Sequence, residues 1–253
     1  MHAPPGSPPK MTQDPARNVK VRMPAVSPVV AYVLLGITIF VYVLQFGSEN
    51  LVGFDVPAAL GMKVNELIIR GQIWRLITPV LLHGSILHLG FNMYALYILG
   101  PGLERFYGHW RFLTLYLLAG FAGNVMSFIF SPNPSLGAST AIFGLLGAQG
   151  VFLYHNRGIY GRPAQRALGN LLMIAVVNLL IGLSPGIDNW GHIGGLIGGT
   201  LFAWYAGPLL IVQDEYPGLA LVDKRSTSEV VRTALSITIL FGALAGVTII
   251  LRV

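Results

Sequence analysis

Ser139 lies where a serine could act as a nucleophile. The segment 135–144 reads SLGASTAIFG, in which the small residues from Gly137 to Ser139 lead from a proline-containing loop into an apolar helix. A serine at a helix start lies beside backbone N–H groups without intrahelical partners, and such groups can hold the negative charge that develops in acyl transfer. Taken alone, the motif favours a serine that only caps the helix, because Gly-x-Ser is a common sequence. Ser139 is therefore a candidate nucleophile that requires a base.

His192 is the candidate base. It opens a second apolar helix in the segment 189–199, NWGHIGGLIGG, where Gly195 and Gly199 have the small-xxx-small spacing that lets two helices approach closely. A neutral imidazole beside Ser139 could accept its proton and return it to a leaving amine. A histidine that merely packs between helices and bonds to a backbone group fits the same pattern. For the close approach, the helix that follows Ser139 offers Gly144, Gly147 and Ala148.

Further polar side chains lie in the segment 83–92, which reads HGSILHLGFN. His88 and Asn92 are four residues apart on one helical face, so both could donate hydrogen bonds to a single oxyanion. His83 lies five residues before His88 and off that face. Hydrogen bonds between helices would explain all three side chains equally well.

The residue patterns of metal-dependent, aspartic and thiol hydrolysis are missing from the sequence. His83, His88 and His192 could suggest a metal site, but the zinc-protease motif HExxH is absent. No acidic residue lies inside an apolar stretch, so the paired acids of an aspartic mechanism are also missing. The chain has no cysteine, which excludes thiol nucleophiles and disulfides. We expect neither a metal nor a cofactor.

The elements that must position these residues are membrane helices. Of the 253 residues, 54% are hydrophobic and 10% are charged, against about 25% charged in soluble domains. No charged residue occurs between Arg111 and Arg157, which leaves room for two spans of roughly 20 residues. The apolar runs are unbroken rather than alternating, which indicates helices and not a β-barrel. The net charge of +6 does not indicate a nucleic-acid partner, because the basic residues lie between the apolar runs and not in one patch.

The predicted fold class is an all-α, polytopic membrane helical bundle with seven transmembrane helices. A polar tail at 1–27 is expected to be disordered, since four of its first ten residues are proline. A six-helix core at 28–206 is followed by a cytoplasmic linker at 207–233 and an additional transmembrane helix within 234–253. A semi-polar segment of about 30 residues between the first two spans should lie partly in the membrane surface. The predicted spans, with ends good to about three residues, are 27–47, 79–100, 112–130, 139–155, 168–183, 189–206 and 234–251.

Charge predicts the orientation of the bundle. With the N-terminal tail in the cytoplasm, 12 of the 16 lysines and arginines lie on the cytoplasmic side, as the positive-inside rule favours. The loops 131–138 and 184–188 carry no basic residue and should face outward, as should the C-terminus. Ser139 and His192 then lie near the outer side of the lipid bilayer. We expect a multi-pass protein of a bacterial inner or plasma membrane.

These segments together resemble the rhomboid family of intramembrane serine proteases. The resemblance covers about residues 65 to 206. The motifs that carry it are GAST at 137–140, HIGGLIGG at 192–199 and HGSILHLGFN at 83–92, together with IWRLITPVLLHG at 73–84 and GLERFYG at 102–108.

The resemblance implies a six-helix core, here with one added C-terminal helix, and a water-accessible cavity open to the outer face. Ser139 would be the nucleophile and His192 the general base, without a third acid. His88 and Asn92, with the backbone N–H of Ser139, would form the oxyanion hole, and Phe143 would stack on the catalytic histidine. The implied substrates are single-span or polytopic membrane proteins.

Two positions depart from the family's pattern. Thr140 follows the nucleophile where the family usually has glycine, and its side chain could crowd the oxyanion region. Gly191 precedes the histidine where the family often has alanine.

Three other functions stay open from the sequence. Thr140 keeps open a catalytically inactive rhomboid-like binding protein, although Ser139 and His192 are both present. A small transporter or channel could use intramembrane histidine and asparagine, but no internal repeat or midplane charge is visible. A structural membrane scaffold would not need a serine and a histidine at two helix starts.

Overall fold

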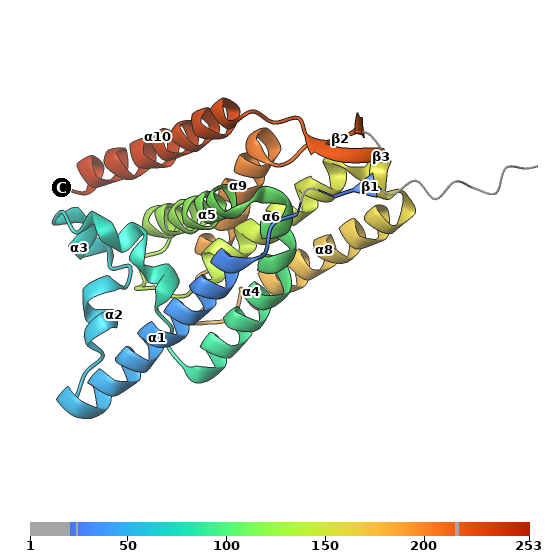
Figure 1. The fold of residues 1–253 in the computed structure, drawn as a ribbon. Helices are drawn as coiled ribbons and strands as arrows, with labels where there is room; N and C mark the ends of the chain where they lie inside the picture. The colour runs from blue at the N-terminus through green and yellow to red at the C-terminus, as the bar shows by residue number, and fades with distance from the viewer. Residues whose placement is uncertain (1–20, 24, 216–217) are drawn as a thin grey trace, which may run out of the picture.

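The structure is a computed structural model that describes residues 21–23, 25–215 and 218–253, and it is mainly helical (Figure 1). The long helices are α1 (Val29–Val52), α4 (Ile86–Tyr107), α5 (His109–Phe130), α6 (Ser139–His155), α8 (Arg162–Ile181), α9 (Asn189–Ala206) and α10 (Thr227–Arg252). The short helices are α2 (Val56–Gly61), α3 (Asn65–Ile69) and α7 (Arg157–Tyr160), with the 3-10 helices η1 (Ile73–Leu76) and η2 (Thr78–Leu81). The strands are β1 (Val21–Arg22), β2 (Leu210–Glu215) and β3 (Gly218–Asp223).

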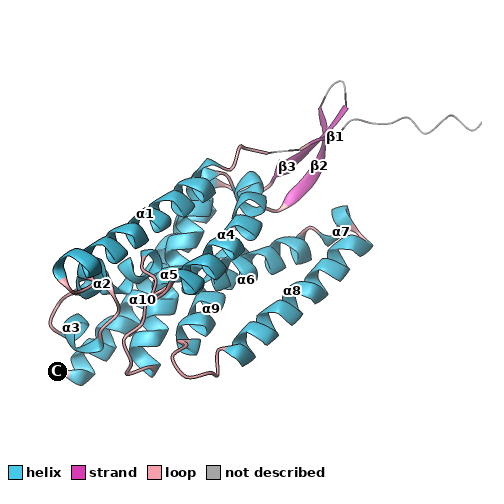
Figure 2. Ribbon diagram, turned by 90° about the horizontal axis from the view of Figure 1, so that it is seen from below, coloured by secondary structure: helices cyan, strands magenta, loops and turns pink. Residues whose placement is uncertain are grey.

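Helices α5, α6 and α9 form the centre of the bundle. Helix α1 packs on α4, α10 packs on α5 and α9, and α8 lies at the periphery, mainly against α6 (Figure 2). Helices α1, α4, α5, α8 and α10 are each long and apolar enough to cross a membrane. With the 17-residue α6 and the 18-residue α9, they make seven long helices within the described residues. The predicted all-α, polytopic class is confirmed.

Burial matches a bundle surrounded by lipid. Phe112, Tyr116 and Phe128 of α5 are completely buried. By contrast, Leu180 of α8 is 61% exposed and Ile250 of α10 is 76% exposed. Apolar surface on this scale is unusual on a protein in water, but it is the normal lipid-facing surface of a membrane bundle.

Several helix ends lie more than three residues from the predicted positions. Helix α4 begins at Ile86 and not at 79, because η2 occupies the earlier apolar residues and Ser85 caps α4 by accepting a hydrogen bond from the backbone N–H of His88. The helix then continues to Tyr107 rather than ending at 100. Helix α1 continues to Val52 rather than 47, while α8 starts at 162 instead of 168 and α10 at 227 instead of 234. The residues that lengthen α1, α4, α8 and α10 are partly polar, so the hydropathy pattern does not include them.

A small sheet with the strand order β1-β3-β2 occupies part of the predicted tail and linker. Strand β3 pairs antiparallel with β2 and parallel with β1. The sequence predicts a disordered tail over 1–27 and an all-α bundle, so strand β1 at Val21–Arg22 and the two strands in the linker differ from that expectation. The rest of that tail up to residue 20, together with residue 24, lies outside the described residues.

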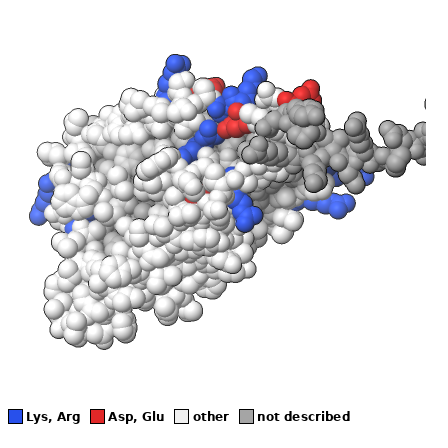
Figure 3. All heavy atoms as spheres, viewed as in Figure 1, with Lys and Arg blue, Asp and Glu red and all other residues white. Residues whose placement is uncertain are grey.

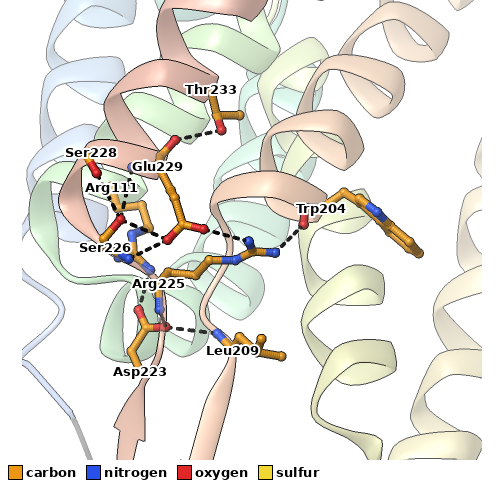
Figure 4. A network of polar contacts seen from close by, with 9 residues as sticks. All are labelled: Arg111, Trp204, Leu209, Asp223, Arg225, Ser226, Ser228, Glu229 and Thr233. Carbon is orange, nitrogen blue, oxygen red and sulfur yellow. Dashed lines mark hydrogen bonds and ion pairs between the residues drawn. The ribbon is translucent and has the colours of Figure 1, made fainter.

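Asp223 ties the sheet to the bundle (Figure 4). Its Oδ2 accepts a hydrogen bond from Nη1 of Arg111 on α5 at 2.6 Å, and its Oδ1 accepts from the backbone N–H of Leu209 at 3.0 Å. Arg225, just before α10, donates to the carbonyl oxygen of Trp204 on α9 at 2.9 Å. On the face drawn in Figure 3, most of the lysine and arginine side chains lie toward this end of the molecule, and most of the remaining surface is uncharged.

Candidate active site

Ser139 and His192 lie at the starts of two neighbouring helices. The Oγ atom of Ser139 is 3.0 Å from Nε2 of His192, although the residues are 53 positions apart. Helix α6 begins at Ser139, and His192 lies in the first turn of α9. Ser139 is half-buried and His192 is 9% exposed. The structure therefore brings the candidate nucleophile and the candidate base into direct contact.

Glycines allow α6 and α9 to approach this closely. A Cβ atom on Gly195 would collide with the backbone of Thr140, and one on Gly199 would collide with the backbone of Gly144. In both contacts the residue number on α9 exceeds the residue number on α6 by the same amount. The two helices therefore run parallel. Their N-termini consequently lie at the same end of the bundle.

Ser139 is not the cap of its helix. Ala138 occupies the N-cap position, where its side chain accepts no hydrogen bond, and Ser139 is the first helical residue. The hydroxyl of Ser139 is thus free to face His192. Like all helix starts, α6 leaves its first backbone N–H groups without intrahelical acceptors, and these groups lie beside the hydroxyl.

The imidazole of His192 lies face to face with Phe143. Their ring centroids are 4.4 Å apart and the ring planes differ by 11°. Nδ1 of His192 is buried and has no hydrogen-bond partner among the described residues. Packing, rather than a second polar contact, therefore orients the ring.

His88 reaches the site across Gly137. A Cβ atom on Gly137 would lie 2.8 Å from both Cε1 and Nε2 of His88 and 3.6 Å from Oγ of Ser139. Gly137 also has a positive φ of 137°, which side chains disfavour. The missing side chain therefore leaves room for His88 next to Ser139.

Asn92 lies one turn after His88, where it is 6% exposed. Its Nδ2 donates to the backbone oxygen of His88 at 2.9 Å. An asparagine amide has two N–H groups, so one stays available for another acceptor.

His83 supports the segment that leads to Ser139. Its Nε2 accepts a long hydrogen bond of 3.4 Å from the backbone N–H of Ala138. Burial is the main cause that lowers the pKa of His83 to about 3, and the nearby charge of His88 is the second. The ring is therefore neutral and can accept a hydrogen bond. Gln45 of α1 holds both backbone groups of His83, at 3.0 and 3.2 Å.

Thr140 directs its side chain between α5 and α9. It is 5% exposed, and Cβ atoms on Gly123 or Gly191 would lie within 3.0 Å of it. Its bulk is accommodated by these two glycines.

Three residues near the site were not predicted from the sequence. Asp188 caps α9, Ser127 of α5 binds the Asp188 carboxylate, and Lys63 donates to the carbonyl oxygens of Ser131 and Asn133 at 2.9 and 2.7 Å. Asp188 had a recognisable signal, because an aspartate just before an apolar helix is a typical N-cap. Ser127 and Lys63 had no local signal, since their partners are distant in the chain.

No group of three His, Asp or Glu side chains within the described residues could share a metal ion. The site consists of a hydroxyl, imidazoles, an amide and the N–H groups of a helix start. Such a set can carry out nucleophilic acyl transfer with general acid–base assistance.

The comparisons with known proteins all lead to the same family. The family model for the Rhomboid domain matches residues 70–209, which is more than half of the chain. Rhomboid protease GluP of Bacillus subtilis (strain 168) is 40% identical over 216 residues, covering 85% of this chain and 40% of the relative. RHOMBOID-like protein 5 of Arabidopsis thaliana is 35% identical over 225 residues, covering 81% of this chain and 71% of the relative.

RHOMBOID-like protein 9, chloroplastic, of Arabidopsis thaliana is 30% identical over 183 residues, covering 72% of this chain and 42% of the relative. The chain thus spans about two fifths of the length of this protein and of GluP.

Proposed function

Because the chain belongs to the rhomboid family, we propose that it is an intramembrane serine endopeptidase that uses Ser139 as nucleophile and His192 as general base. The observation that carries the proposal is the 3.0 Å contact between Oγ of Ser139 and Nε2 of His192. Its substrates would be single-span or polytopic membrane proteins, cut in or beside a transmembrane segment.

In the proposed reaction, Oγ of Ser139 attacks the scissile carbonyl carbon while Nε2 of His192 takes the hydroxyl proton. For Nε2 to accept, the neutral imidazole carries its own proton on Nδ1. When the tetrahedral intermediate collapses, the C–N bond breaks and His192 gives the proton to the leaving amine. The acyl group stays on Ser139 until His192 activates a water that hydrolyses the ester.

The oxyanion of the intermediate requires donors. We assign this role to the backbone N–H of Ser139, the imidazole of His88 and the free amide N–H of Asn92. Removal of one such donor typically costs about 100- to 1,000-fold in kcat. No carboxylate binds Nδ1 of His192 among the described residues, so the proposed machinery is a dyad and not a triad.

The proposal is tested with the full chain, purified in detergent or liposomes, and a single-span model substrate. Cleavage is expected for the wild type and should fall to background for Ser139→Ala and for His192→Ala. A fluorophosphonate should label the wild type and not Ser139→Ala. Cleavage that survives both substitutions overturns the dyad, and a wild type that binds the substrate without cleavage or labelling supports an inactive binding protein instead.

A further inference from the structure

Asp188 holds the start of the helix that carries His192. Its Oδ1 accepts a hydrogen bond from the backbone N–H of Gly191 at 3.0 Å, and its backbone oxygen accepts from the N–H of His192 at 3.2 Å. Two consecutive N–H groups at the helix start are therefore fixed by one residue. The cap uses only one of the two carboxylate oxygens of Asp188.

The second oxygen connects α9 to α5. Oδ2 of Asp188 accepts a short hydrogen bond of 2.5 Å from Oγ of Ser127. Ser127 is fully buried and lies in the last turn of α5. The direction of this bond is fixed, since an ionised carboxylate can only accept. A carboxylate shared between a helix start and a neighbouring helix sets the position of one helix along the other.

The same serine reaches the segment that precedes the nucleophile. Oγ of Ser127 is 3.3 Å from Oγ of Ser135, and because Ser127 already donates to Asp188, Ser135 must be the donor in this contact. Ser135 lies four residues before Ser139, and its backbone pairs with that of Lys63 through two hydrogen bonds of 2.9 and 3.0 Å. Hydrogen bonds thus join the start of α9, the end of α5 and the approach to Ser139.

Gly191 leaves the room that the carboxylate needs. A Cβ atom on Gly191 would lie 2.9 Å from Oδ2 of Asp188. The carboxylate is therefore confined between this backbone and Ser127, rather than free to change its rotamer as an exposed capping side chain would be.

We propose that Asp188 and Ser127 form a positioning pair that sets the register of α9 against α5 and so keeps Nε2 of His192 within hydrogen-bond distance of Oγ of Ser139. The kinetic part rests on the proposed function. Neither residue touches the reacting atoms, so the pair acts on kcat through geometry. A misplacement of about 1 Å at a catalytic group can cost on the order of 100-fold in rate.

The experiment separates capping from positioning. Asp188→Ser keeps a capping oxygen but is too short to reach Ser127, whereas Ser127→Ala keeps the cap and removes the link. Both variants should lower kcat by about 10- to 100-fold with little change in KM, and both should slow fluorophosphonate labelling. Asp188→Asn, which keeps the length and an acceptor for Gly191, should recover part of the rate.

Ser226→Ala is the matched control, because Ser226 caps α10 through the backbone N–H of Glu229, far along the chain from the site. It should lower the thermal unfolding temperature without changing kcat per folded molecule. If Ser127→Ala and Asp188→Ser keep the wild-type kcat, or lose no more than Ser226→Ala, the pair has no positioning role and the proposal is overturned.

A second measurement is independent of catalysis. The unfolding temperatures of Asp188→Ala, Ser127→Ala and the double variant should reveal coupling, with the double variant hardly worse than the worse single variant. If the fall in unfolding temperature of the double variant equals the sum of the two single falls, the proposed pair is overturned. If the wild type neither cleaves nor labels, the proposed function fails, and this cycle still decides whether the pair exists.

Discussion

A Cβ atom on Gly191 would lie 3.0 Å from Cγ2 of Thr140, so the two residues fit together because one of them lacks a side chain. We predict that Gly191→Ala lowers both the unfolding temperature and the cleavage rate, since overpacking of this kind costs about 1–3 kcal/mol. Adding Thr140→Ser, which removes only the methyl group, should recover part of the loss. Thermal unfolding in detergent and kcat measure both effects.

The control for this pair is Gly246→Ala in α10, where an added Cβ would meet nothing within 4 Å. It should be neutral or slightly stabilising, because alanine is the better helix former. If the double variant Gly191→Ala/Thr140→Ser loses as much unfolding temperature and kcat as the two single variants together, the proposed fit is contradicted.

The stacking of Phe143 on His192, at 4.4 Å between ring centroids, gives a second prediction. Phe143→Leu keeps an apolar side chain but loses the flat contact. An aromatic pair contributes about 0.5–1.5 kcal/mol beyond its burial, so kcat should fall roughly 2- to 10-fold while KM stays near the wild-type value. Steady-state kinetics on the model substrate provide the measurement.

Phe152→Leu is the comparison for that change, because Phe152 lies on the same helix and packs against Phe106 with ring centroids 4.9 Å apart. It should reduce stability and leave kcat unchanged. An equal fall in kcat for both variants would argue that α6 is generally sensitive and that the stacking has no specific role.

The sequence predicted the parts of the site that depend on local pattern. A small-residue turn before an apolar helix indicated Ser139, and glycine spacing indicated the close approach of the helix that carries His192. The link between Ser127 and Asp188 joins residues 61 positions apart. Nothing in the sequence around either residue indicates which partner it binds. Only the folded arrangement of α5 and α9 reveals such a contact.

The fold was predicted less well where short-range chemistry competes with hydropathy. The apolar residues of η2 were included in the second span, although Pro79 favours a separate turn and Ser85 starts the helix proper. The sheet was missed because the two apolar runs at 209–212 and 219–222 are too short for spans. Their length and flanking polar residues are typical of paired strands.

Arg252 fastens the end of α10 to the end of α5. Its guanidinium donates to the backbone oxygens of Phe128 and Ile129 at 2.9 and 2.8 Å. Phe128 and Ile129 follow Ser127 in the chain. Arg252→Gln should lower the unfolding temperature, because it removes the charged donor of both hydrogen bonds. A hydrogen bond to a charged group contributes about 1.5–3 kcal/mol. Arg232→Gln, an exposed arginine on the same helix, should change little, and equal effects of the two would contradict the role of Arg252.

Lys63 gives a prediction in alkaline solution. Burial lowers the pKa of Lys63 from 10.5 to about 8, with Asp188 partly opposing the shift. Between about pH 8 and 10.5 the unfolded chain still binds the proton that the folded chain has lost, so this group makes the free energy of unfolding rise with pH across that window. Lys63→Met should remove this rise. Thermal unfolding of both proteins at a series of pH values tests it, and parallel curves would contradict it.

The orientation of the bundle can be measured directly, because the chain contains no cysteine. Ser184→Cys and Lys224→Cys introduce single thiols at exposed positions, one in the loop before α9 and the other just after β3. If the starts of α6 and α9 face outward, as the distribution of basic residues predicts, a membrane-impermeant maleimide added to intact cells should label the first variant. The second should be labelled only after the membrane is permeabilised. The opposite pattern would put Ser139 and His192 near the cytoplasmic face, and substrates would then have to be cleaved from that side.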